Sequence, residues 1–255
     1  MSSNRLKLNA DKTQFIWLGP ALQLDKVGDI RLYVGSVDIS PLDHARDLGV
    51  MLDSLLTMKQ HADTVARGCF YQMWQLRSVR RSLTFNALHT LVHALIHSKV
   101  DYCNAVLYGA PLYAARRLQA VLNAAARLIT GTRLNEHINP ILHDTLHWLP
   151  VTQRVEYKIV LMTYSCVQTS PTYLHGICRP VASVKGRVMP RSANFGELVE
   201  PRTRGKRYGP HSFHVAAPSV WNHDIYAMMT LVVNNSLAIW KHFYSHWPIR
   251  QRRLW

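Results

Sequence analysis

Acidic residues are scarce in this sequence. Its 255 residues include 15 Asp and Glu against 30 Lys and Arg, which gives a formal net charge of +15 besides 14 histidines. The charge is distributed unevenly. The formal net charge is −1 over residues 1–63 and +16 over residues 64–255. A balance this basic favours an anionic partner, most often nucleic acid, over an ordinary basic protein without one. The uneven distribution indicates two parts with different roles.

Cysteine and long apolar runs are also scarce. The four cysteines form no CxxC pair, which is typical of reduced thiols in an intracellular protein. Charged residues interrupt the first 20 positions, so no signal-peptide core is present. The longest mostly apolar run, residues 227–240, is too short and too polar to span a bilayer. We therefore predict an intracellular protein without a membrane partner.

Motifs that would identify an enzyme are missing. The sequence has no GxGxxG or GxxxxGK[ST] loop, no serine-hydrolase elbow, and no close acidic cluster that would hold two Mg²⁺ ions. On its own residues the chain shows no active site, and we predict no metal site.

Two groups of metal-ligand residues leave a metal enzyme open as a third alternative. Histidines recur at i, i+4 and i+8, but on an α-helix they drift from the edge of the apolar face toward its back, so we expect satisfied, partly exposed side chains. The second group consists of two cysteines and one histidine, and the spacing of these residues fits no closed four-ligand zinc pattern. The groups are His89, His93 and His97, and Cys166, His175 and Cys178.

The apolar periodicity predicts a mainly α fold with minor β structure. Residues 1–53 form strands with turns, residues 54–175 a helical bundle, and residues 176–255 a loop-rich basic region with a few short strands. The expected strands are Phe15–Leu18, a hairpin of residues 30–34 and 37–39, residues 45–52 with Gly49 as a bulge or close approach, and pieces of "GELVEP" and "HSFHVAAPSVWN". The expected helices begin at Met58 and cover residues 84–100, 112–130 with Gly131 as cap, 136–146, 151–169 and part of 225–247.

The first helix has two faces. Its apolar stripe consists of Val65, Cys69, Met73, Leu76, Val79 and Leu83. On the opposite face Arg67, Trp74 and Arg81 are seven residues apart, and Arg77 and Arg80 flank them. An outward row of arginine and tryptophan could follow a phosphate backbone and stack on a base. The alternative is a solvated face on which Trp74 packs against a neighbour.

Several stretches occur in an order that resembles one protein family. They are "LKLNADKTQFIWLG", "ARDLGVMLD", "LIHSKVDYCNAVLYGAP", "RLQAVLNAAARLITGTR", "HINPILHDTLHWLPVTQRVEYKIVLMTY" and "SFHVAAPSVWN", and together they cover about residues 6–222. The set closely resembles the carboxy-terminal part of reverse transcriptases of non-LTR (LINE-type, jockey- and CR1-like) retrotransposons. This resemblance implies RNA-templated DNA synthesis by the parent protein.

The resemblance assigns roles to several residues. Asn9, Lys12 and Thr13 match the last block of the polymerase palm, in which Lys12 would act as general acid. Leu48 and Gly49 match the primer grip, a hairpin that supports the 3′ end of the primer. The domains would then be 1–53, an incomplete palm edge with primer grip; 54–175, the thumb that holds the duplex; and 176–255, a basic carboxy-terminal region.

The resemblance also implies what this chain lacks. The family's aspartate pair, which binds Mg²⁺, would precede Met1, as would the fingers and most of the palm. We therefore expect a fragment that contains no cofactor of its own, is inactive alone and binds RNA, DNA or an RNA–DNA duplex. The alternative is a domesticated, non-catalytic RNA- or DNA-binding adaptor.

Overall fold

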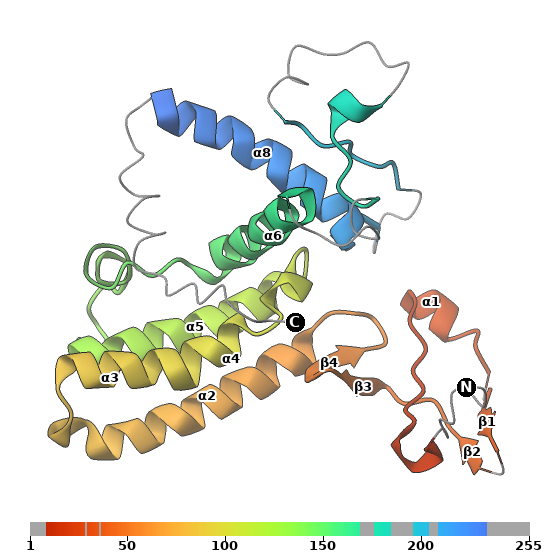
Figure 1. The fold of residues 1–255 in the computed structure, drawn as a ribbon. Coiled ribbons are helices and arrows are strands. Elements are labelled where there is room, and N and C mark those ends of the chain that lie inside the picture. Colours follow the sequence, from red (N-terminus) through yellow and green to blue (C-terminus); the bar gives the residue numbers. More distant parts are fainter. Residues whose placement is uncertain are drawn as a thin grey trace. The chain divides into compact units, whose positions relative to one another are not determined.

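The structure is a computed structural model that describes residues 9–28, 30–35, 37–168, 176–184, 196–203 and 209–233. The chain divides into two compact units, residues 1–155 and 156–255. Helices dominate both, and the strands are short and antiparallel, which confirms the predicted mainly α fold with minor β structure (Figure 1). The predicted domain boundary between residues 53 and 54 stays a prediction.

The strands of the first unit form two separate hairpins. β1 (Leu32–Val34) pairs with β2 (Val37–Ile39), as predicted, and β3 (His44–Asp47) pairs with β4 (Val50–Asp53). The prediction of one strand over residues 45–52 is wrong. Leu48 and Gly49 have φ values of 44° and 88°, and two consecutive residues with positive φ form the tight turn of a hairpin.

The predicted strand at Phe15–Leu18 is also wrong. The segment makes a single parallel bridge, between Ile16 and Leu42, and Leu18 is exposed. The segment lies beside residues 42–54 but belongs to neither sheet. Only isolated backbone hydrogen bonds join it to those residues, such as the one from Leu42 N–H to the Phe15 carbonyl at 2.7 Å. Two short helical turns flank it, η2 (Ala10–Lys12) and α1 (Ala21–Leu24).

The helices of the first unit follow the predicted order. They are α2 (Lys59–Val79) with the 3₁₀ turn η3 (Arg80–Ser82), then α3 (Phe85–Val92), the π-helical turn η4 (His93–His97) and α4 (Ser98–Asp101), then η5 (Asn104–Leu107) and α5 (Leu112–Thr130). The Thr84 hydroxyl accepts a hydrogen bond from Ala87 N–H and caps α3. Gly131, with φ 77°, ends α5 in the left-handed conformation that glycine favours. The predicted helices 84–100 and 112–130 are confirmed.

The core of the first unit lies between α2, α3 and α5. It is formed by Cys69, Met73 and Leu76 of α2, Leu88 and Val92 of α3, and Leu118, Val121, Leu122 and Ala125 of α5. The predicted stripe on α2 is confirmed at its centre, whereas Val79 is exposed. Val79 is the last residue of α2, and the tighter winding of η3 rotates the following residues away from the stripe.

The predicted helix 136–146 is shorter than expected, because only residues 139–145 are helical and most of them form the π-helical turn η6 (Ile141–Thr145). Pro140 is helical, with φ −59° and ψ −38°, and lies in the first turn of this short helix, where the missing N–H of a proline is tolerated. The helix predicted over 151–169 is present as α6 (Val151–Gln168), and residue 169 lies outside the described residues.

The second unit contains the rest of α6, two short segments and α8 (Phe213–Val233). Pro180 and Leu198 form an antiparallel bridge, and 3₁₀ turns lie at η7 (Val181–Ser183) and η9 (Gly209–His211). "GELVEP" thus contributes one bridged residue, whereas the strand predicted in "HSFHVAAPSVWN" is wrong, because this stretch forms the start of α8. The side chain of Asn222 on α8 explains the bridge's position, since its amide accepts from Leu198 N–H at 2.9 Å and donates to the Leu198 carbonyl at 3.0 Å.

The helix predicted within residues 225–247 is present as far as residue 233, and the remainder lies outside the described residues. Among the described helices, none combines the length and the apolar character that crossing a membrane requires.

Candidate nucleic-acid interface

The outward side of α2 and η3 gathers cationic and aromatic side chains. We call this surface the basic face and define it by Arg67, Tyr71, Trp74, Arg77 and Arg81, all of which are exposed. No Asp or Glu occurs between residues 64 and 100. The absence of carboxylates along this stretch leaves the positive charge of the basic face uncompensated from within the helix.

Two aromatic rings lie at the centre of the basic face. Trp74 is 67% exposed and Tyr71 is 57% exposed. Their ring centroids are 6.3 Å apart with an interplanar angle of 28°, and Gln75 Nε2 donates to the Tyr71 hydroxyl at 3.1 Å. The sequence reasoning missed Tyr71, although its position four residues after Arg67 and three before Trp74 places it on the same side of a helix.

The arginines of the basic face make no contact with a fixed partner among the residues that the structure describes. Within the described part of the chain, neither a hydrogen bond nor an ion pair is formed by Arg67, Arg77 or Arg81. Asp63, the single acidic residue of α2, contacts α5, because its Oδ1 accepts from the Tyr113 hydroxyl at 2.7 Å and forms an ion pair with Arg117, whose Nε is 3.2 Å away. The guanidinium groups are therefore available to bind anions.

Arg80 differs from the other arginines predicted to bind nucleic acid. Its Nε donates to the Leu128 carbonyl at 2.7 Å, and its Nη2 donates to the Ile129 carbonyl at 3.4 Å. Both acceptors are carbonyls near the end of α5, which lack partners within the helix. A β-carbon added at Gly131 would lie 3.0 Å from Arg80 Nη2, so the glycine leaves room for this contact. We therefore leave Arg80 out of the basic face.

The residues assigned to the palm and primer grip lie before α2, in the turn η2 and at the tip of the β3–β4 hairpin. Lys12 ends the turn η2, which is stabilised by Thr13 Oγ1 donating to the Asn9 carbonyl at 2.8 Å. Leu48 lies at the tip of the β3–β4 hairpin and is 83% exposed. Gly49 follows Leu48. A β-carbon added at Gly49 would lie only 3.3 Å from the Tyr102 ring, so the predicted close approach of the backbone is confirmed.

The β3–β4 hairpin is anchored to the helices at three places. The Tyr102 hydroxyl donates to the Leu48 carbonyl at 2.6 Å, and Met51 N–H donates to His61 Nδ1 at 3.4 Å. At the base of the hairpin, the Asp53 carboxylate accepts from the backbone N–H groups of Thr57 and Met58 at 2.9 and 2.8 Å. The hairpin and the start of α2 are therefore held in one arrangement.

The three histidines of α3 and η4 form a stack against Trp148. Ring centroids are 4.5 Å apart for His89 and His93, 4.3 Å for His93 and His97, and 4.1 Å for His97 and Trp148. The prediction that the three histidines drift around the helix is wrong. The wider π-helical turn places the rings of His93 and His97 on the same side of the helix. His97 is also neither exposed nor satisfied: it is buried, and both of its ring nitrogens lack a hydrogen-bond partner.

Burial keeps this histidine stack neutral. Desolvation, together with the neighbouring His89 and Arg154, lowers the pKa of His93 to about 4, and burial lowers the pKa of His97 well below its usual value. Arg154 is paired with Asp101, at 2.8 Å between Nη1 and Oδ2. Among the described residues, no group of three His, Cys, Asp or Glu side chains has the arrangement of a metal site. His175 lies outside the described residues, so the Cys166–His175–Cys178 alternative stays untested.

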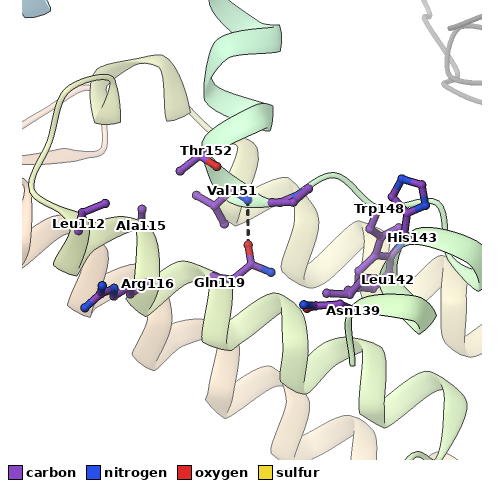
Figure 2. Close-up of a pocket in the computed structure, with 11 residues that line it drawn as sticks. Leu112, Ala115, Arg116, Gln119, Asn139, Leu142, His143, Trp148, Val151 and Thr152 are labelled. Atoms are coloured by element: carbon purple, nitrogen blue, oxygen red, sulfur yellow. Dashed lines mark hydrogen bonds between the residues drawn. The ribbon is translucent and has the colours of Figure 1, made fainter. Parts of the chain in front are cut away.

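A pocket of about 480 Å³ lies between α5 and the segment that leads into α6 (Figure 2). Its lining is mostly apolar, with Leu142 and Trp148 on one side and Leu112 and Ala115 on the other. Gln119 reaches across, and its Oε1 accepts from Val151 N–H at 2.9 Å. The lining residues include no carboxylate and no thiol, so the pocket offers shape and apolar contact but no paired acid and base.

Comparisons with models of protein families, with curated proteins and with solved structures found no match to this chain.

Proposed function

We propose that this chain binds RNA or DNA duplex through the basic face, with weak sequence preference. The observation on which this proposal rests is the combination, along α2 and η3, of three guanidinium groups without partners among the described residues and two exposed aromatic rings. Arginines bind phosphates as bidentate donors, and exposed aromatic side chains stack on bases or sugars. A purely solvated face would not need two large aromatic rings, since exposing them to water is unfavourable.

We further propose that the chain is a carboxy-terminal part of a non-LTR retrotransposon reverse transcriptase and that α2 belongs to its thumb. The ordered set of matching stretches supports this proposal. The basic face supports it independently, because a thumb must contact the phosphates of the template–primer duplex. Lys12 and the Leu48–Gly49 turn would be the palm and primer-grip contributions. Without an aspartate pair that binds Mg²⁺, the chain by itself would not incorporate nucleotides.

Duplex affinity measured over a salt series tests the binding proposal. Each phosphate contact releases condensed counterions, so the slope of log K against log salt changes by about 0.9 per contact on B-DNA. We expect Arg67→Ala and Arg81→Ala each to weaken binding to all sequences and to flatten the slope by about one unit. Trp74→Ala should cost about 1–3 kcal/mol of binding free energy with little change in slope.

Arg80→Ala is the matched control for these variants. It removes one positive charge from the same stretch of chain, but its guanidinium caps α5. We expect it to lower thermal stability while leaving the affinity and the salt slope close to those of the parent. If Arg67→Ala and Arg81→Ala behave like Arg80→Ala in binding, the basic face is not the interface.

Primer extension on an RNA template with Mg²⁺ or Mn²⁺ tests the relation to the polymerase. We expect no extension by the pure chain, and Lys12→Ala should leave duplex affinity unchanged. Template-dependent extension would contradict the proposed fragment. The second candidate, a non-catalytic adaptor, also predicts no extension. The two candidates differ when the palm and fingers of such a polymerase are added as a separate polypeptide. This addition should allow extension if the chain is the proposed polymerase part, and should not if the chain is an adaptor.

A further inference from the structure

The pocket between α5 and the segment that leads into α6 plays no part in the proposed nucleic-acid function. The basic face lies on α2 and η3, whereas every lining residue of the pocket falls within 112–152 (Figure 2). The inner surface includes Ala115 of α5 and the buried side chains of Leu142, Trp148 and Val151. A cavity of about 480 Å³ with such a lining has the size and the apolar character of a small-molecule site.

Two polar side chains of the pocket are hydrogen-bond donors without partners. The Trp148 indole N–H is buried and has no hydrogen-bond partner among the described residues. Arg116 is exposed and forms neither a hydrogen bond nor an ion pair within the described part of the chain. Gln119 is satisfied by contrast, because its Oε1 accepts from Val151 N–H and its Nε2 donates to Asn123 Oδ1 at 2.9 Å. The pocket therefore offers donors to a ligand that carries oxygen acceptors.

The charge of the pocket has one sign. Its lining includes Arg116 and His143 but no Asp or Glu. His143 is paired with Asp144, at 3.1 Å between Nδ1 and Oδ1, so Arg116 carries the positive charge that has no counterion among the described residues. In Figure 2 Arg116 lies at one end of the pocket and Trp148 at the other. An anionic group is thus favoured at the Arg116 end.

We propose that this pocket binds an amphipathic carboxylate, a small molecule with an elongated apolar body and a hydroxyl or carbonyl oxygen at its far end. The carboxylate pairs with the Arg116 guanidinium, whose planar fork matches it with two parallel hydrogen bonds. The apolar body lies over Leu142 and Val151, and the far oxygen accepts from the Trp148 N–H. Each of the two unpartnered donors then has an acceptor, and the apolar lining is removed from water.

The same features disfavour other small molecules. A cationic ligand would bring its charge toward Arg116, and the lining has no carboxylate to compensate it. A nucleotide carries more than one negative charge, whereas the described lining offers a single cation without a counterion. A neutral hydrocarbon would leave the Trp148 N–H buried without a partner.

Isothermal titration calorimetry of the full chain tests the proposal with dodecanoate and 12-hydroxydodecanoate, each below its micellar concentration. We expect both acids to bind, and the hydroxylated acid to bind roughly threefold to tenfold more tightly through one added hydrogen bond. Dodecyltrimethylammonium keeps the chain but reverses the charge, and it should bind at least about tenfold more weakly than dodecanoate.

Four variants locate the binding. Arg116→Gln should weaken both acids about tenfold or more, whereas Arg133→Gln, which removes an exposed positive charge outside the pocket, should not. Trp148→Phe keeps an aromatic ring and removes the N–H, so it should abolish the preference for the hydroxylated acid. Ala115→Trp should fill the cavity and block both acids. Thermal unfolding of each variant establishes that it is folded.

Binding that is absent in the parent chain, equal for the two acids, or unchanged in folded Arg116→Gln and Ala115→Trp would overturn the proposal. Binding of an acidic apolar peptide in place of both acids would also overturn it, because the pocket would then belong to a protein partner.

Discussion

The basic face and the histidine stack both consist of polar residues that recur at helical spacing, yet their environments are opposite. Arg67, Trp74 and Arg81 repeat every seven residues and are exposed. His89, His93 and His97 repeat every four residues and lie against a buried tryptophan. The spacing of the two sets is equally regular, so spacing alone does not distinguish a binding surface from an internal contact.

Solvation separates the two sets. The guanidinium groups of the basic face are in water and can exchange water for phosphate at small cost. The His97 imidazole has already lost its water, and among the described residues it has gained no hydrogen bond in return. A buried polar group without a partner costs about 1–3 kcal/mol. The stack is therefore expected to affect folding, and the basic face to affect binding.

The largest contrast should come from two tryptophan substitutions. Trp148 is buried and contacts all three histidine rings, so Trp148→Ala should lower the free energy of unfolding by about 3–5 kcal/mol. Trp74→Ala should change it by about 0.5 kcal/mol or less, since Trp74 is exposed. Urea denaturation of both variants measures the difference. Equal losses would mean that Trp74 is part of the packed structure and would argue against the basic face.

The histidine stack should make stability fall in acid. The pKa of His93 is about 4 in the folded chain against 6.5 in the unfolded chain, so the unfolded state binds more protons below pH 6.5. Stability is fully present above pH 6.5 and should decrease toward pH 4, by at most about 1.4 kcal/mol per pH unit for each histidine. The pKa of His97, lowered well below 6.5, acts in the same direction.

Substitution within the stack separates its effect from that of other buried histidines such as His61, whose pKa is also lowered by burial. His97→Leu should flatten the dependence of unfolding free energy on pH between 6.5 and 4. His143→Leu, at an exposed position, serves as the control for loss of a histidine. An unchanged slope in His97→Leu would place the acid sensitivity elsewhere.

The smallest predicted contrast concerns two adjacent arginines. Arg80→Ala removes two hydrogen bonds to carbonyls near the end of α5 and should cost about 1–2 kcal/mol of unfolding free energy. Arg81→Ala removes no described contact and should change stability by about 0.5 kcal/mol or less. Thermal unfolding of the two variants is the measurement. A larger loss for Arg81→Ala would reverse the structural roles given to these residues.

The sequence predicts the long helices well because their signals are local. For α5, the apolar spacing and the glycine at 131 together determine where the helix lies and where it ends. The apolar centre of α2 is predicted in the same way. Each of these signals lies within a few residues of the feature that it predicts.

The errors arise where the decisive contact is distant in sequence or the backbone is unusual. Leucine is an infrequent residue at positive φ, so the apolar pattern of "ARDLGVML" indicates one strand, and only the resemblance to the primer-grip hairpin implies a turn at Leu48 and Gly49. Arg80 could not be told from Arg81, because its acceptors lie 48 and 49 residues away. The strand prediction at the start of α8 is wrong where the helix contains Pro218 in its interior, a residue that the local sequence rules exclude from helices.

The π-helical turn at His93–His97 has a consequence for how this chain should be compared with others. Such a turn accommodates one more residue than the α-helical turn it replaces. A protein of common ancestry in which α3 and α4 form one uninterrupted α-helix would therefore have one residue fewer between Val92 and Ser98. An alignment of the two should place its gap inside this turn. If the gap were placed outside this turn, the residues between the gap and the turn, including the histidines, would be aligned one position away from their true counterparts.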